Sequence, residues 1–249
     1  MKKLLLLIPA LLSVSAFSLA GKVPAGAAGS VEYEVRYRLG NVTTKVASAT
    51  ISLENDSWEG QSAYHTRAVI RAASVFRLFM NAEYLADAYL SASSLDPLYY
   101  LNPFKKNGKD GKVEYVYDRA AHNVRVEAVQ PPADPQTVTH PLDNRTMDLL
   151  ALLHFVRFLD QPSPSQPLRL KVLLGGSAYP GVLTSKGRDS ESIPGVEAER
   201  FLLHLTERGL MENGSGNVIH LWRSTGPDRR LLGLEVALST GAMSIRIKE

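Results

Sequence analysis

Two basic side chains lie three positions apart in the most apolar stretch of the chain. His154 and Arg157 fall within residues 146–159, where ten of the 14 positions are apolar. If this stretch is helical, the two side chains are neighbours on its surface. A buried arginine needs a carboxylate, a carbonyl or a bound anion, because an unpaired buried charge is very costly. Arg157 is therefore a structural partner, a side chain that reaches solvent at a rim, or a contact for an anionic headgroup.

Local patterns of catalysis and metal binding are absent from the sequence. The chain has no cysteine, and none of its six histidines forms a pair with metal-ligand spacing. Distant histidines could still converge, although separate polar or surface positions are the simpler interpretation. Residues 175–177 lack the Lys-Ser/Thr end of a phosphate loop, and no Gly-x-Ser-x-Gly nucleophile is present. We therefore predict no catalytic residue, no metal site and no cofactor.

Paired carboxylates for glycoside hydrolysis stay open as an alternative, because the two partners can be distant in sequence. Glu54, Asp56 and Glu59 lie around Trp58 and resemble such a site. Turn-forming residues surround them, so we interpret all three as solvated loop charges.

Alternating apolar and polar residues predict that a β-sheet carries most of the chain. In residues 31–39, odd positions are apolar or aromatic and the even positions from 32 to 38 are charged, which is typical of a half-buried antiparallel strand. Turn residues separate similar segments about ten residues apart, as in a sandwich, barrel or curved sheet. The predicted strands are 31–39, 45–53, 63–72, 83–91, 98–104, 113–117, 124–128, 168–174, 179–186, 196–207, 217–222, 231–238 and 243–247. Proline-rich residues 131–141 are predicted to form a loop.

Residues 146–159 are predicted to form one helix that is apolar on nearly every side. Such a helix must be covered on more than one face, so we expect it to lie against a concave sheet. The fold predicted is therefore mostly β, a curved antiparallel sheet or open barrel with one buried apolar helix. Residues 161–167 form a stiff polar linker, but similar strands follow it. We therefore prefer one β-rich domain over residues 30–249 to two domains.

The first 20 residues have the pattern of a secretory signal peptide. Lys2 and Lys3 precede a short apolar run, and small residues end at Ala20. A retained membrane anchor is the alternative, but the apolar run is short for a membrane span, and no later stretch is long enough for one. Cleavage would remove two of the 28 basic residues and reduce the net charge from +3 to +1. This nearly balanced chain gives no reason to expect nucleic-acid binding, and we predict a periplasmic location.

Three motifs carry a resemblance to a known family. The first is a Trp-x-Ser-x-Asp-x-x-Arg pattern, matched by Trp222, Ser224, Asp228 and Arg230, with two extra turn residues before Asp228 and one residue fewer before Arg230. The second is a helix with Asp148 and Arg157 at its ends, and the third is the alternating segment 32–37. The sequence is similar to domain-of-unknown-function family 3108, a family of exported bacterial proteins. Departures from its pattern are Ala151 in place of a common serine, the inserted Gly226 and Pro227, and Leu232 in place of proline.

The resemblance implies an envelope protein with a curved antiparallel sheet, similar to periplasmic lipoprotein carriers whose half-open barrels hold acyl chains. It brings no agreed activity and therefore no catalytic residue. Our first hypothesis is an accessory protein that binds a lipid or another amphipathic molecule, with Arg157, Tyr99, Tyr100 and Trp222 as candidate ligand contacts. The alternatives are a glycan-directed hydrolase and a non-catalytic partner of an envelope complex that binds through a sheet edge.

Overall fold

The computed structural model describes residues 23–24, 26–76, 83–106, 108–143, 145–160, 163–193, 195–206, 218–238 and 240–248. The predicted signal peptide, residues 1–20, lies outside the described residues. Parts of the predicted linker 161–167 lie outside them as well.

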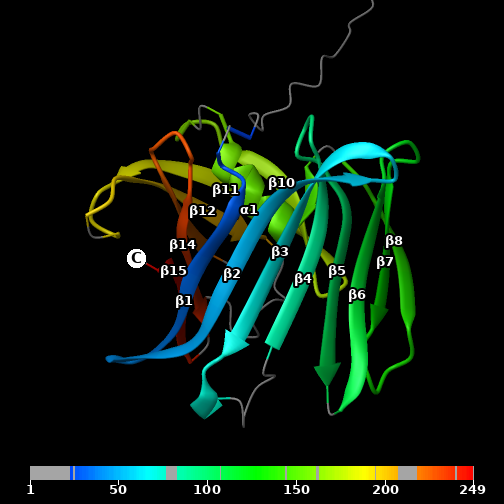
Figure 1. The fold of residues 1–249 in the computed structure, drawn as a ribbon, viewed down its shortest axis with the longest axis horizontal. Helices are drawn as coiled ribbons and strands as arrows, with labels where there is room; N and C mark the ends of the chain where they lie inside the picture. Colours follow the sequence, from blue (N-terminus) through cyan, green and yellow to red (C-terminus); the bar gives the residue numbers. More distant parts are fainter. Residues whose placement is uncertain are drawn as a thin grey trace, which may run out of the picture.

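Fifteen strands in the described ranges form one continuous sheet (Figure 1). Its order is β8-β7-β6-β5-β4-β3-β2-β1-β15-β14-β13-β12-β11-β10-β9, so β8 and β9 are its two edges and the sheet is not closed. All pairs of neighbours are antiparallel except the parallel pair β9 and β10. The strands are β1 (Gly29–Leu39), β2 (Val42–Trp58), β3 (Gln61–Ala72), β4 (Glu83–Ser91), β5 (Pro97–Lys106), β6 (Lys109–Asp118), β7 (Asn123–Val129), β8 (Gln136–Pro141), β9 (Thr146–Asp148), β10 (Leu168–Leu174), β11 (Ser177–Asp189), β12 (Ala198–Leu205), β13 (Val218–Ser224), β14 (Leu231–Leu238) and β15 (Gly241–Ile247).

The first and last strands pair in the middle of this sheet. The register runs from Tyr33 opposite Ile247 to Arg38 opposite Ala242. The chain therefore forms two antiparallel meanders, β1 to β8 and β10 to β15, which are joined through β1 and β15, and β9 adds a parallel edge strand beside β10. Between the meanders, residues 142–145 connect one edge strand to the other.

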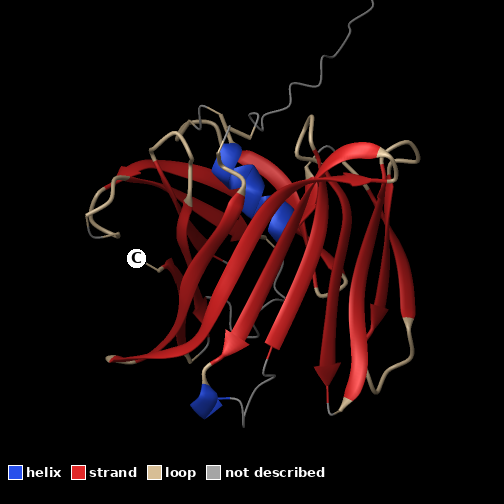
Figure 2. Cartoon of the chain, viewed as in Figure 1, coloured by secondary structure: helices blue, strands red, loops and turns tan. Residues whose placement is uncertain are grey.

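Within the described ranges, the sheet curves around one α-helix, α1 (Leu149–Phe158), and a short 3-10 turn η1 (Ser74–Phe76) follows β3 (Figure 2). Every residue of α1 except Leu149 is buried. The prediction of a mostly β, curved and open sheet with one buried apolar helix is confirmed. The helix begins three residues later than predicted, because residues 146–148 form β9 beside β10. Asp148 has extended backbone angles and caps the helix by accepting a hydrogen bond from the Ala151 amide at 2.9 Å.

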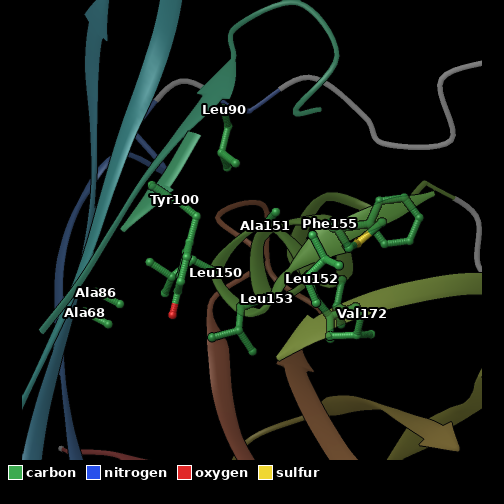
Figure 3. Close-up of a cluster of buried hydrophobic side chains, with 14 of the residues drawn as sticks. Ala68, Ala86, Leu90, Tyr100, Leu150, Ala151, Leu152, Leu153, Phe155 and Val172 are labelled. Carbon is green, nitrogen blue, oxygen red and sulfur yellow. The ribbon is translucent and has the colours of Figure 1, made fainter. Parts of the chain in front are cut away.

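Opposite faces of α1 pack on opposite walls of the curved sheet (Figure 3). Leu150 and Leu153 point toward the wall that carries Ala68 and Ala86, which are directly paired on β3 and β4. Leu152 lies on the side of Val172 in β10. Alanines on one wall leave room for the leucines of the helix, so the two surfaces interlock without large gaps.

Arg223 of β13 satisfies the carboxyl end of the helix. Its Nη1 donates to the carbonyl oxygens of Val156 at 2.8 Å, Arg157 at 3.0 Å and Leu159 at 2.8 Å. The last carbonyls of a helix have no partner within the helix, and a buried end needs partners from elsewhere. Glu199 of β12 accepts from Arg223 Nε at 2.6 Å and balances the charge.

Two loop predictions were wrong. Glu54 and Asp56 lie within β2, which continues to Trp58, and the chain reverses at Glu59 and Gly60, both with positive φ. Residues 136–141, predicted as part of a loop, form the edge strand β8. An edge strand tolerates the proline at its end, because one side of the strand has no neighbour to receive an amide hydrogen bond.

We expect Arg223→Met to lower the free energy of unfolding by about 3 kcal/mol, because it leaves buried carbonyls and Glu199 without their partner. Urea unfolding followed by circular dichroism measures the change. Arg188→Met is the matched control, since Arg188 forms a solvent-exposed ion pair with Glu197 and should contribute less than about 1 kcal/mol. Equal effects of the two substitutions would contradict the capping role of Arg223.

Candidate functional site

The two candidate tyrosines are adjacent on β5 and therefore lie on opposite faces of the sheet. Tyr100 points inward, stacks on Tyr115 at 4.9 Å between ring centroids, and has its hydroxyl 3.4 Å from that of Tyr84. Tyr99 points outward, stacks on Trp58 at 4.6 Å, and donates to Glu114 at 2.7 Å. The two side chains cannot line the same pocket.

Trp222 lies on the outer face of β13 but is buried by its neighbours. The guanidinium carbons of Arg246 and Arg200 lie 4.1 Å and 5.8 Å from the indole ring centroid. The indole N–H donates to Asp189 at 3.0 Å. Trp222 is thus held in a small outer cluster, apart from the interior that contains Tyr100.

Arg157 is 7% exposed and bonds to neutral acceptors. Its Nε donates to the Arg229 carbonyl at 3.2 Å and its Nη2 to the Ala27 carbonyl at 3.1 Å. Its Nη1 lies 3.4 Å from His154 Nδ1. No ion pair of Arg157 occurs among the described residues, so this cation is buried without a paired carboxylate. Burial lowers the pKa of Arg157, yet a guanidinium remains charged at any physiological pH.

A pocket of about 290 Å³ opens beside Arg157 at one end of the sheet. Residues 26–32, Asp228, Arg230, Ile247 and Lys248 form the rest of its lining. We call it the rim pocket. Three cations and two carboxylates surround it, which gives it a small excess of positive charge.

His154 is neutral and fixed in one tautomer. Thr66 Oγ1 donates to the Ser52 carbonyl at 2.8 Å, so its oxygen accepts the proton of His154 Nε2, also at 2.8 Å. Nδ1 then carries a lone pair toward Arg157. Burial, with a smaller contribution from the nearby Arg157 charge, lowers the pKa of His154 to about 3. The histidine therefore links the helix to β3 as an uncharged bridge.

Asp148 is a fully buried carboxyl group at the other end of α1. It accepts from the Tyr117 hydroxyl at 3.1 Å as well as from the Ala151 amide. Burial raises the pKa of Asp148 to about 6, against the opposing effect of these hydrogen bonds. This group changes charge near neutral pH.

At the end of the sheet opposite the rim pocket, inner-facing apolar side chains are only partly covered. We call this region the basal mouth and define it by Tyr37, Ile70, Tyr84, Phe104, Leu234 and Met243. All but Tyr84 are partly buried and pack on the edge of the core, whereas Tyr84 is 38% exposed. Register places them together: Tyr37 is paired with Met243, and Ile70 with Tyr84. Residues 26–32 of the rim pocket precede and begin β1, whereas Tyr37 lies near its other end.

Sequence reasoning missed the residues of the basal mouth and, of its four candidates, identified only Tyr100 near it. The phase of the apolar alternation in β1 could have identified them. Tyr37 and Leu39 continue the inward-facing positions of Tyr33 and Val35 to the last residue of the strand. A strand that stays apolar on one face up to its turn lines the end of the sheet as well as its centre.

The family model described as "Protein of unknown function (DUF3108)" matches residues 32–242. The chain belongs to this family. Among curated proteins, none matches the sequence. Among solved structures, the chain is similar to a beta-barrel-like protein of the DUF1849 domain of unknown function from Brucella abortus, with a TM-score of 0.55 and 6% identity over 92% of this chain and 97% of that chain. At this identity the similarity supports the barrel-like fold alone.

The motif residues of this DUF3108 protein hold its turns and helix in place. Ser224 Oγ accepts from the Arg230 amide at 2.8 Å, and Arg230 forms an ion pair with Asp228, so the turn between β13 and β14 is bonded internally. Asp148 caps α1, and Arg157 ties its last turn to neighbouring carbonyls. In the described part of this DUF3108 chain, no helix is long and apolar enough to cross a membrane, and no cluster of three His, Asp or Glu residues suits a metal ion.

His154 and Asp148 are expected to give opposite dependences of stability on pH. His154, with its folded pKa below the ordinary 6.5, stabilises the fold above pH 6.5, and this contribution is lost as the pH falls toward 3. Asp148, with its folded pKa above the ordinary 3.8, stabilises the fold below pH 3.8, and this contribution is lost as the pH rises through 6.

As the pH rises, we therefore expect Asp148→Asn to gain stability relative to the unmodified protein between about pH 3.8 and 6. We expect His154→Gln to lose stability relative to the unmodified protein as the pH rises between about pH 3 and 6.5. Urea unfolding at a series of pH values measures both differences. Parallel curves for all three proteins would contradict the assigned protonation states.

Proposed function

We propose that the protein is an exported accessory protein of the bacterial envelope that binds an amphipathic molecule, with the apolar part of that molecule in the basal mouth. The partly uncovered apolar wall at the open end of the sheet is the observation that carries this proposal. The signal-peptide pattern of residues 1–20 supports a periplasmic location.

The basal mouth suits an acyl chain or a similar apolar group for a physical reason. Its side chains come from six strands, β1, β3, β4, β5, β14 and β15. All but Tyr84 pack against the core and keep part of their surface in solvent, so an apolar ligand would remove that surface from water. The helix α1 occupies the part of the concave face beside β3, β4, β9 and β10.

The Tyr84 and Tyr100 hydroxyl groups supply a polar contact at this mouth. They lie 3.4 Å apart, with Tyr84 the more exposed of the two. A pair of hydroxyls can both donate to and accept from a ligand headgroup. Tyr100 therefore keeps its role as a proposed ligand contact, one layer behind Tyr84.

The other three candidates lie elsewhere. Arg157 is our proposed contact for an anionic group in the rim pocket, at the opposite end of the sheet from the mouth. Tyr99 and Trp222 lie on the outer face, and the mouth does not use them. A role as a non-catalytic partner has one observation in its favour, since the edge strand β8 has solvent access along its length and has a neighbour only in β7.

The ligand proposal is tested with the uncharged fluorophore N-phenylnaphthylamine, whose emission rises in apolar surroundings. We expect the protein to bind it, and Tyr84→Asp or Met243→Asp to weaken binding by about tenfold or more, because a carboxylate in the mouth must be desolvated when the probe enters. Val138→Asp is the control, since Val138 is exposed on β8, outside the mouth.

Native mass spectrometry of protein purified without detergent then identifies any co-purified lipid. Equal probe binding by all three variants, or failure of the unmodified protein to bind the probe, would rule out the mouth as the ligand site.

A further inference from the structure

Three aliphatic side chains are exposed to solvent at the end of the sheet that carries the basal mouth, which we call the basal end. Leu39 is 58% exposed, Val42 67% and Val75 71%. With Tyr84, these make four of the five large hydrophobic side chains that are exposed in the described ranges; the fifth is Val138 of β8. We call Leu39, Val42 and Val75 the basal tips.

The basal tips come from two turns that lie at the same end of the molecule (Figure 1). Leu39 and Val42 are directly paired across the turn between β1 and β2. Val75 lies in η1, just after β3, and the Ala73 amide bonds to the Val46 carbonyl of β2 at 2.8 Å. The pairing of Ala47 with Ala72 shows that the β1–β2 hairpin extends five residues past that point. The tips therefore project at separate points from the end of the sheet.

Their exposure is unlike that of ordinary hairpin turns, in which polar residues dominate. Gly40 and Asn41 supply the turn chemistry, yet the residues on both sides of them are aliphatic. Scattered apolar residues on a surface need no explanation, but a concentration at one end of a protein marks an interaction site.

Basic residues accompany these side chains. The segment from Arg38 to Lys45 carries two cations and no acidic residue, and carboxylates of other strands balance both: Glu235 lies 3.9 Å from Arg38 and Glu34 lies 2.7 Å from Lys45. At the same end, the β5–β6 turn presents Lys105 and Lys109 against Asp110, with Lys105 and Asp110 3.5 Å apart. Arg71 is balanced by Glu83 at 3.1 Å. Four carboxylates thus face five cations at the basal end (Arg38, Lys45, Arg71, Lys105 and Lys109), which leaves a small excess of positive charge there.

We propose that the basal tips dock the protein on an anionic lipid bilayer. Aliphatic side chains enter the boundary between headgroups and acyl chains, and nearby cations are attracted to anionic headgroups. The basal tips lie on separate segments, and a fluid bilayer can accommodate their spacing without having a surface of complementary shape. The cation excess favours this occupant over a second copy of the same chain, whose docking surface would carry the same charge.

This docking is independent of the proposed ligand site in its residues, but the two fit together. The tips lie at the same end of the sheet as the basal mouth, so a docked protein would present the mouth to the bilayer. The two can fail separately, because probe binding in solution requires no vesicle and vesicle binding requires no probe.

Sedimentation with vesicles tests the proposal. Protein purified without detergent is mixed with vesicles of phosphatidylcholine alone or of phosphatidylcholine with a quarter phosphatidylglycerol. We expect sedimentation with the anionic vesicles, and a loss of about tenfold or more in the double variant Leu39→Ser, Val42→Ser, because two aliphatic side chains no longer leave water. Val75→Ser should give a smaller loss in the same direction.

Val138→Ser is the matched control, since it removes an exposed valine outside the basal end. We expect it to sediment as the unmodified protein does, and circular dichroism melts verify that every variant is folded. Failure to sediment with anionic vesicles, or an equal loss in Val138→Ser, would overturn the proposal. So would a dimer in sedimentation velocity without lipid that the Leu39 and Val42 double variant abolishes, because a second copy would then cover the tips.

Discussion

Burying a helix inside a curved sheet creates one requirement that the remaining structure must meet: the polar ends of the helix have to find partners away from water. Asp148 meets it at the amino end and Arg223 at the carboxyl end. Each of these charged groups then needs support of its own, which Tyr117 and Glu199 provide. The apolar middle of α1 explains why the helix is buried, but these end contacts explain why it has one position along the sheet.

Alternation and apolar content were enough to predict the sheet and its helix. Residues 83–91, 168–174 and 231–238 have the predicted strand boundaries. The strands β8 and β9 were missed for physical reasons. β8 has no buried face to impose alternation. β9 owes its extended form to pairing with β10, which lies far from it in the sequence, so the local pattern gives no sign of this contact.

The candidate site was less predictable than the fold, and the reason differs between residues. Tyr99 and Tyr100 could have been separated from the sequence, since neighbours in a strand face opposite ways. The partners of Arg157 could not, because they are backbone carbonyls at Ala27 and Arg229, and any residue type supplies a carbonyl. The basal mouth combines residues from strands at both ends of the chain, and only the pairing of β1 with β15 reveals that they meet.

The pairing of β1 with β15 affects how the chain folds during its synthesis. While a chain is being made, β1 can find β2 as soon as both have emerged, but its other side must wait for the last strand of all. Until β15 arrives, the edge that will become the centre of the sheet is open to strands of other chains. Loss of only a few residues at the carboxyl terminus would therefore affect the middle of the sheet first. Each meander would then have an unpaired edge strand, β1 or β14, that could pair with strands of other chains.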